Sequence, residues 1–326
     1  MQLFWKSLLQ EILTVITKSS KLFLELLKVL LPVSILVKVL SEIGFVSVLG
    51  TWLMPVMNLV GLPGEMGLVW ATGLISSPYA GIFAYIAISE TVPLTIAQVT
   101  VLSAMMLIAH NMIIEVSIGK KIGVSIRYQV LLRVIAAFAF GILLSQFYLR
   151  LNLLNGMPLS IWAKEPSSTS LLAWSLSTLK NYLTIYLVMT GLIGLMRVME
   201  KLHLLEKLYT LSEPILNFFG MSKKAAPIAI IGMTLGLAVG GGLIIDEAKS
   251  GNLSRKDIFL VLTSMCLMHS VIEDTIIMAT IGADLSGILF ARLLFSFIIF
   301  YVISRSKFIQ KVFFNESAVL TESPVP

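Results

Sequence analysis

The sequence contains few cysteines, few histidines and few charged residues. Cys266 is the one cysteine among 326 residues, which excludes an internal disulfide and a cysteine metal cluster. Only 13% of the residues are charged, against about 25% in a soluble domain, while 57% are hydrophobic. The mean hydropathy is +0.94. These values predict an all-α polytopic membrane protein that has the lipid bilayer as its main surroundings.

Catalytic motifs are missing from the sequence as well. It has no phosphate-binding glycine loop, no nucleophile elbow and no helical zinc motif with two histidines four residues apart. We therefore expect no enzymatic activity, no cofactor and no resident metal site. Active transport by such a chain would depend on an ion gradient or on a partner, because the chain carries no nucleotide-binding domain.

Six apolar runs are long enough to cross a hydrocarbon core, which takes about 20 residues. They lie near residues 22–40, 93–116, 128–149, 171–196, 257–281 and 286–303. Two further apolar stretches, 64–88 and 225–245, are interrupted by glycine and proline. We expect each of these two to form a re-entrant hairpin. Residues 45–60 and 204–219 form shorter, amphipathic stretches.

A single shift of 159 residues superposes rare residues from the two halves of the chain. The pairs are Pro55 with Pro214, Asn58 with Asn217, Gly73 with Gly232, His110 with His269, Glu115 with Asp274, and Arg133 with Arg292. Chance alignment of apolar stretches is the alternative, but two of only three histidines coincide. We therefore predict two homologous repeats.

The repeats divide the chain into five predicted segments. They are an N-terminal amphipathic helix (1–21), a first repeat (22–150), an external linker (151–170), a second repeat (171–304) and a cytoplasmic tail (305–326). Each repeat has three crossings, a hairpin and an amphipathic helix. Because three is odd, the second repeat is inverted relative to the first.

Lysine and arginine placement sets the predicted orientation, since cytoplasmic loops carry the excess of these residues. If the interrupted stretches are hairpins, the basic groups at 6–21, 120–127, 197–256 and 305–311 all fall on one side. The chain is then a multi-pass protein of the inner or plasma membrane, with both termini cytoplasmic. The net charge of +6 reflects this topology, so we expect no nucleic-acid partner.

The two hairpins form the first candidate site. Small residues recur four apart, as Gly73, Ser77 and Gly81 and as Gly232, Gly236 and Gly240. Packing of helices is one explanation of this spacing. Breaks expected at Pro78 and at 240–242 favour another, because paired broken helices in inverted repeats mark the binding sites of transporters. The helix ends at 76–77 and 239–241, with the hydroxyl groups of Ser76, Ser77 and Tyr79, suit a hydrogen-bonding solute.

A second group of polar residues follows each hairpin. It consists of His110, Asn111 and Glu115 in the first half, and His269, Ser270, Glu273 and Asp274 in the second. Ionisable side chains in a crossing helix normally face the bundle interior or a water path. Their role is solute binding, proton coupling, cation coordination or a polar clamp between the halves. Arg133 and Arg292 are expected to snorkel to the interface or to pair with Glu115 and Asp274.

Both halves resemble the nucleoside-recognition, or Gate, family. The resemblance rests on PVMNLVGLPGEMGLVWATGLISSPYAGIFAY (55–85) and, more weakly, on PILNFFGMSKKAAPIAIIGMTLGLAVGGGLII (214–245). That family includes the gate segments of ferrous-iron transporters, spore maturation proteins A and B, and the core of concentrative nucleoside transporters. The resemblance covers residues 30–300 as a fusion of two Gate units. It implies a solute site lined by Gly73, Ser76, Ser77, Gly81, Gly236 and Gly240, with His110, Asn111, Glu273 and Asp274 as polar companions.

These observations together predict a transporter or permease for a small polar solute, nucleoside-like or similar, bound between opposed hairpins. H⁺ or Na⁺ is a candidate coupling ion, and a homo-oligomer is a candidate assembly. Two alternatives stay open. One is a non-transporting membrane assembly factor of the spore-maturation type. The other is a ferrous-iron permease, although the iron transporters carry a cytosolic GTPase that this chain lacks.

Overall fold

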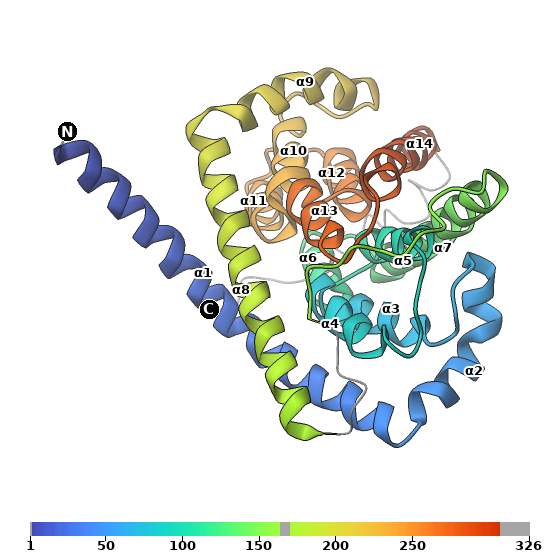
Figure 1. The fold of residues 1–326 in the computed structure, drawn as a ribbon. Coiled ribbons are helices and arrows are strands. Elements are labelled where there is room, and N and C mark those ends of the chain that lie inside the picture. Colours follow the sequence, from blue (N-terminus) through green and yellow to red (C-terminus); the bar gives the residue numbers. More distant parts are fainter. Residues whose placement is uncertain (1, 164–169, 307–326) are drawn as a thin grey trace, which may run out of the picture.

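The computed structural model describes residues 2–163 and 170–306, and its regular elements there are all helical (Figure 1). Within these residues, five spans are long and apolar enough to cross a membrane. They are Ile96–Lys121, Ile126–Arg150, Leu171–Lys201, Arg255–Ala279 and Ser286–Arg305. The all-α membrane fold predicted from composition is confirmed.

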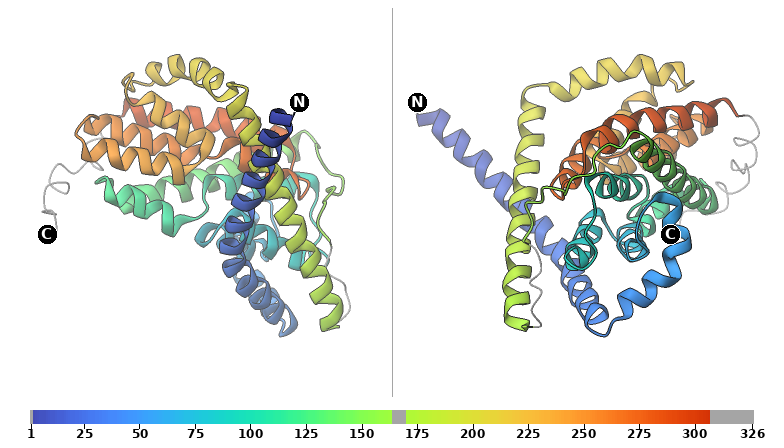
Figure 2. Two further views of the ribbon diagram at one scale, coloured as in Figure 1. Left: turned by 90° about the vertical axis from the view of Figure 1, so that its left-hand side faces the viewer. Right: turned by 45° about the vertical axis from the view of Figure 1, so that its right-hand side comes forward.

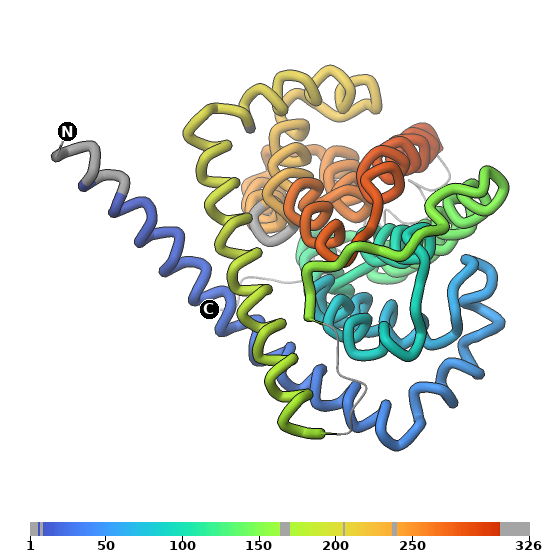
Figure 3. The backbone as a smooth tube through the Cα atoms, viewed as in Figure 1, coloured from blue at the N-terminus to red at the C-terminus, as the bar shows by residue number. Residues whose placement is uncertain are grey.

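The α-helices of the two halves follow one another in the same order along the chain, α1 to α7 and α8 to α14 (Figure 3). The first half contains α1 (Gln2–Glu42), α2 (Phe45–Met57), the short 3-10 helix η1 (Asn58–Val60), α3 (Met66–Ile75), α4 (Pro78–Ile88), α5 (Ile96–Ile108), α6 (Met112–Lys121) and α7 (Ile126–Arg150). The second half contains α8 (Leu171–Lys201), α9 (Leu204–Phe218), α10 (Ala226–Leu235), α11 (Leu237–Lys249), α12 (Arg255–Leu267), α13 (Val271–Ala279), the π-helix η2 (Ser286–Ala291) and α14 (Arg292–Arg305).

Left-handed backbone conformations recur at the same shift of 159 residues. The pairs are Gly44 with His203, Gly61 with Gly220, Asn111 with Ser270, and Gly123 with Gly282. Three of these eight positions carry a side chain, for which positive φ is uncommon. Equivalent turns therefore occur at equivalent places in the two halves, even where the residue type does not favour them.

Helix α1 is one continuous helix of 41 residues, whereas the sequence predicted a boundary after residue 21. At 1.5 Å per residue it is about 60 Å long, roughly twice the thickness of a hydrocarbon core. It packs against α8 and α4, and its N-terminal end extends away from the other helices (Figures 1 and 2). Three charges, Glu25, Lys28 and Lys38, fall in the predicted crossing at 22–40, which is not among the five apolar spans.

Two helical hairpins, α3–α4 and α10–α11, occupy equivalent positions in the two halves. The first breaks at Ser76 and Ser77, directly before Pro78, as predicted. The second breaks at Gly236, where φ is +88°, so the predicted break at residues 240–242 is wrong. These three glycines instead lie inside α11, because a glycine run remains helical when the turn is already made at a residue that tolerates positive φ.

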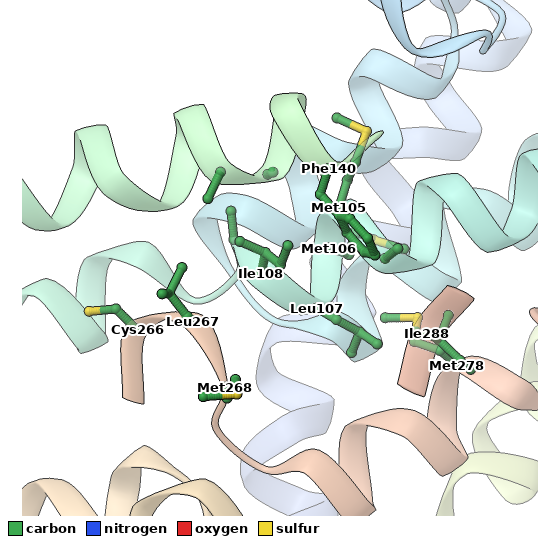
Figure 4. Close-up of a cluster of buried hydrophobic side chains, with 14 of the residues drawn as sticks. Met105, Met106, Leu107, Ile108, Phe140, Cys266, Leu267, Met268, Met278 and Ile288 are labelled. Atoms are coloured by element: carbon green, nitrogen blue, oxygen red, sulfur yellow. The ribbon is translucent and has the colours of Figure 1, made fainter. Parts of the chain in front are cut away.

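The crossing helices that follow the hairpins are themselves interrupted. Helix α5 ends at Ile108 and α6 begins at Met112; α12 ends at Leu267 and α13 begins at Val271. Each hairpin also packs across the molecule, because α4 contacts α13 and α11 contacts α6. The two hairpins and the two interrupted helices thus form one core. Buried apolar side chains from α5, α7, α12, α13 and η2 fill this region (Figure 4), including the free Cys266.

The chain between the halves runs as an extended strap. The N–H groups of Ile96 and Ala97, at the start of α5, donate to the carbonyls of Gly156 and Leu154 over 2.9 Å each. At its other end, Trp162 Nε1 donates to Thr280 Oγ1 over 2.8 Å. The strap therefore bonds to both halves. Residues 164–169 of the predicted linker and 307–326 of the predicted tail lie outside the described residues.

Candidate functional site

The interruptions in α5–α6 and α12–α13 bring two histidines into contact. His110 and His269 lie in these interruptions, 159 residues apart, and both are almost completely buried. Their Nε2 atoms are 2.8 Å apart and their ring centroids 4.6 Å apart. Equivalent residues of the two halves therefore meet at the centre of the structure.

The backbone fixes the tautomer of both rings. His110 Nδ1 lies 2.8 Å from the carbonyl oxygen of Met106, and His269 Nδ1 lies 2.8 Å from that of Met265. A carbonyl oxygen only accepts, so each Nδ1 must carry the hydrogen. In a neutral imidazole the other nitrogen is then an acceptor. When both rings are neutral, the two Nε2 atoms therefore face each other with lone pairs.

Two buried carboxylates surround these nitrogens. Glu115 Oε1 is 3.1 Å from His269 Nε2 and 3.5 Å from His110 Nε2. Asp274 Oδ2 is 3.7 Å from His110 Nε2 and has no hydrogen-bond partner among the described residues. The ligand atoms of His110, His269 and Asp274 all lie within 4.8 Å of one another. These three residues are the group that could hold a metal ion.

Arg133 on α7 supports the first half of the cluster. Its Nη1 is 2.5 Å from Glu115 Oε2, and both side chains are buried. Its Nε and Nη2 donate to the carbonyls of Ile108 and His110 over 2.9 and 2.8 Å. These carbonyls are left without a helical partner by the interruption. Arg133 therefore forms the predicted ion pair with Glu115. It also caps the C-terminal end of α5.

The equivalent Arg292 is fully buried, yet none of its three guanidinium nitrogens has a hydrogen-bond partner among the described residues. Among the described residues, Arg292 does not form the ion pair with Asp274 that was one of its two predicted roles. The carbonyl of Leu267 is equivalent to that of Ile108, which Arg133 binds in the first half. In the second half this carbonyl accepts a hydrogen bond from Ser296 Oγ at 3.4 Å. The two halves thus differ here, although both carry a histidine and an arginine at equivalent positions.

A hydrogen bond across the halves completes the polar cluster. Tyr79 on α4 donates its hydroxyl to Glu273 Oε1 on α13 over 2.9 Å. Both side chains are half-buried. The structure therefore brings Tyr79, His110, His269, Glu273 and Asp274 together from the residues predicted to form the site.

The predicted glycines pack the hairpin arms and leave no open space between them. Gly73 lies against Gly81 and Met106, and Gly232 lies against Gly240 and Met265. At the first tip, Ser77 Oγ accepts from Ala80 N as an N-cap, and Ser76 is half-buried. At the second tip, a Cβ on Gly236 would overlap Ser270 Oγ. Asn111 N–H donates to the carbonyl of Gly73, which joins the first hairpin to the interruption beside it.

Sequence reasoning missed several residues that hold the site. Met106 and Met265 position the histidine rings through their carbonyls, and a main-chain role leaves no signal in residue type. Their signal is positional, because both precede a histidine by four residues. A cavity of about 230 Å³ lies elsewhere, lined by residues including Gln98, Ser145 and Asn155. It contains none of the predicted site residues.

Comparison with known proteins supports the membrane assignment without defining a family. No protein-family model matches the sequence, and no solved structure matches it either. The chain is 28% identical over 270 residues to a Bacillus subtilis (strain 168) protein described as uncharacterized membrane protein YvoD. The match covers 81% of this chain and 85% of that protein. The chain is an α-helical membrane protein, and its resemblance to the Gate family stays a prediction.

Proposed function

We propose that the protein is a transporter or permease for a small polar solute, bound between the two hairpins and the two interrupted helices. The observation that carries this proposal is the placement of buried ionisable residues at interruptions in two apolar spans. His110 lies in the span Ile96–Lys121, and His269 lies in Arg255–Ala279.

The energetic cost of this arrangement argues for a function. An ionisable side chain at the centre of a membrane helix costs about 2.5–3.5 kcal/mol by insertion scales. Glu115 and Asp274 are buried within these two spans, and Arg292 is buried within a third, Ser286–Arg305. Among the described residues, no hydrogen bond offsets the burial of Arg292. Apolar residues at these positions would pack the helices equally well without this cost, so packing does not explain the charged side chains.

The repeated architecture supports the same proposal. Interrupted helices in matching repeats place unpaired backbone groups around a central site, and movement of one repeat against the other gives alternating access. In this chain each hairpin contacts the interrupted helix of its own half, through Gly73 and Asn111 in the first half and Gly236 and Ser270 in the second. Each hairpin also contacts the other half, because α4 packs against α13 and α11 packs against α6. The halves are therefore coupled through the elements that would have to move.

Flux measurements on the full chain in proteoliposomes test this proposal. A thermal-shift screen of nucleosides, amino acids and organic acids would first select solutes, and the best would be tested for uptake. We expect Glu273→Gln to reduce uptake at least about tenfold, because Glu273 is the half-buried carboxylate that meets Tyr79. Ser76→Ala tests the first hairpin tip. Glu200→Gln, an exposed glutamate on α8, is the control and should keep wild-type uptake.

Two outcomes would contradict the proposal. Uptake that is unchanged in both Glu273→Gln and Ser76→Ala would remove the site. A wild-type protein that moves no solute of the panel, and that co-purifies with a defined protein partner, would favour a membrane assembly factor.

A further inference from the structure

The histidine pair presents an electrostatic problem as long as both rings are neutral. Both Nδ1–H groups are committed to carbonyls, so two neutral rings point Nε2 lone pairs at each other over 2.8 Å. Two acceptors at this distance repel. A cation between them would turn the repulsion into attraction.

We propose that His110, His269 and Asp274 bind a divalent first-row transition-metal ion through Nε2, Nε2 and Oδ2, with Glu115 Oε1 as the fourth ligand. Imidazole nitrogen with carboxylate oxygen is a ligand set for zinc, iron, copper or nickel, whereas Mg²⁺ and Ca²⁺ prefer oxygen alone. This proposal concerns binding and does not depend on transport.

The carboxylates favour a metal ion over a shared proton. A proton between the two Nε2 atoms would satisfy those nitrogens only. It would leave Asp274 Oδ2, buried and without a hydrogen-bond partner among the described residues, still 3.7 Å from His110 Nε2. A metal ion satisfies all three atoms together. The buried, unpartnered oxygen is thus an observation independent of the histidine geometry.

The distances among His110, His269 and Glu115 are close to those around a small ion, whereas Asp274 Oδ2, 3.7 Å from His110 Nε2, would have to move inward. With bonds of about 2.05 Å, neighbouring ligands of a tetrahedral ion are about 3.3 Å apart. The separations of Glu115 Oε1 from His269 Nε2 and His110 Nε2 are 3.1 and 3.5 Å. The two nitrogens, at 2.8 Å, would move apart by about half an ångström. Both histidines lie in non-helical segments, where such a movement disturbs no regular helix.

The surroundings of the ligands are those of a metal site. Metal-binding histidines usually donate their second ring N–H to a carbonyl or carboxylate, which fixes the tautomer. Both rings do so here. Arg133 binds Glu115 Oε2 and leaves Oε1 facing the histidines. The ion would join the halves, because His110 and Glu115 belong to the first repeat and His269 and Asp274 to the second.

Metal binding can be measured on the full chain in detergent, purified through an affinity tag that contains no histidine. The protein is stripped with a chelator and dialysed against Zn²⁺ or Co²⁺. We expect one ion per wild-type chain by elemental analysis. The Co²⁺ form should show visible d–d absorption, and X-ray absorption of the Zn²⁺ form should show two imidazole nitrogens.

Variants assign the ligands. His269→Ala and Asp274→Asn should weaken Zn²⁺ binding at least about tenfold, since loss of a supporting residue alone costs 10–100-fold. His203→Ala is the matched control, because His203 is the third histidine of the chain and is exposed. It should bind one ion with wild-type affinity.

Three results would overturn the proposal. They are a wild-type chain that retains no stoichiometric ion, a Zn²⁺ site with an all-oxygen shell, and equal binding by wild type and Asp274→Asn. The first two use the wild-type protein alone, so a variant that fails to fold does not leave the question open. Flux in proteoliposomes is a separate readout, and its absence would not affect this inference.

Discussion

The two halves of this protein have matching helices and matching histidines, yet their equivalent arginines differ in the hydrogen bonds they form. Arg133 binds Glu115 and the carbonyls of Ile108 and His110. Arg292, at the equivalent position, has no hydrogen-bond partner among the described residues. A repeated fold therefore does not carry a repeated polar network.

This difference indicates a division of roles. In the first half, the arginine neutralises the acid and secures the end of α5, so that side of the site is fixed. In the second half, Asp274 Oδ2 and the Arg292 guanidinium are both buried, and neither has a hydrogen-bond partner among the described residues. The second half therefore provides the carboxylate oxygen, Asp274 Oδ2, that is available to bind a ligand. The following variants test this comparison.

The largest effect is expected at the arginines. Arg133→Met leaves Glu115 buried without its cation, which should cost about 3–5 kcal/mol of stability. Arg292→Met removes a buried guanidinium that makes no hydrogen bond to the described residues. Because burying an unpaired charge is costly, this variant should be neutral or stabilising. Denaturant or thermal unfolding in detergent measures both. Equal destabilisation by the two variants would remove the asymmetry.

The glycine contacts of the hairpins give the next comparison. A Cβ at Gly240 would overlap the backbone of Gly232, 2.9 Å from its nitrogen. A Cβ at Gly81 would stay 3.2 Å from the Gly73 Cα, and its closest contact, Met106 Sδ at 2.6 Å, belongs to a flexible side chain. Gly240→Ala should therefore cost about 1–3 kcal/mol and Gly81→Ala less. Gly242→Ala meets nothing within 4 Å and should be neutral or stabilising by about 0.5–1 kcal/mol. Thermal unfolding of the three variants should rank them in this order, and a destabilised Gly242→Ala would contradict it.

The hydrogen bond between the halves should contribute less. Tyr79→Phe removes the donor to Glu273 Oε1 and should cost about 0.5–1.5 kcal/mol. A double-mutant cycle with Glu273→Gln isolates the interaction. A coupling energy of zero would show that the two half-buried groups are solvated independently.

The smallest effect is expected at the surface contact between α1 and α8. Hydrogen bonds from Arg197 and Lys201 hold the pKa of Glu11 below its ordinary value of 4.5. A carboxylate with a lowered pKa stabilises the fold above its unfolded pKa, and the stabilisation is lost as the pH falls through the folded pKa. Glu11→Gln should therefore lower stability slightly at pH 7 and have no effect well below pH 4. Comparison of its melting temperature with that of the wild type at both pH values checks this, and a difference that persists in acid would refute it.

Local signals in the sequence were enough to predict part of the site. The first hairpin breaks where Ser77 caps a helix that begins with Pro78, and both preferences are intrinsic to those residues. The second break was misplaced, because residues 240–242 are rich in glycine but need no positive φ. The glycine that adopts a positive φ, and so makes the turn, is Gly236. Composition shows which residues permit a turn, and packing decides which of them makes it.

The interruptions at residues 109–111 and 268–270 could not be predicted in this way. They read Ala-His-Asn and Met-His-Ser, without glycine or proline, and the left-handed turns fall on Asn111 and Ser270. Contacts from elsewhere in the chain impose these conformations, such as the bond from Asn111 N–H to the Gly73 carbonyl. The shift of 159 residues paired the two histidines in sequence, but it could not show that they touch.

The strap between the halves determines where they can separate. Gly156 is bonded to the start of α5, and Ile161 donates to the carbonyl of Thr280 over 3.1 Å. Five residue steps reach at most about 17 Å, so the start of α5 and Thr280 cannot move farther apart than this while both bonds hold. A rocking motion of the halves would then pivot there, with its widest excursion on the opposite face.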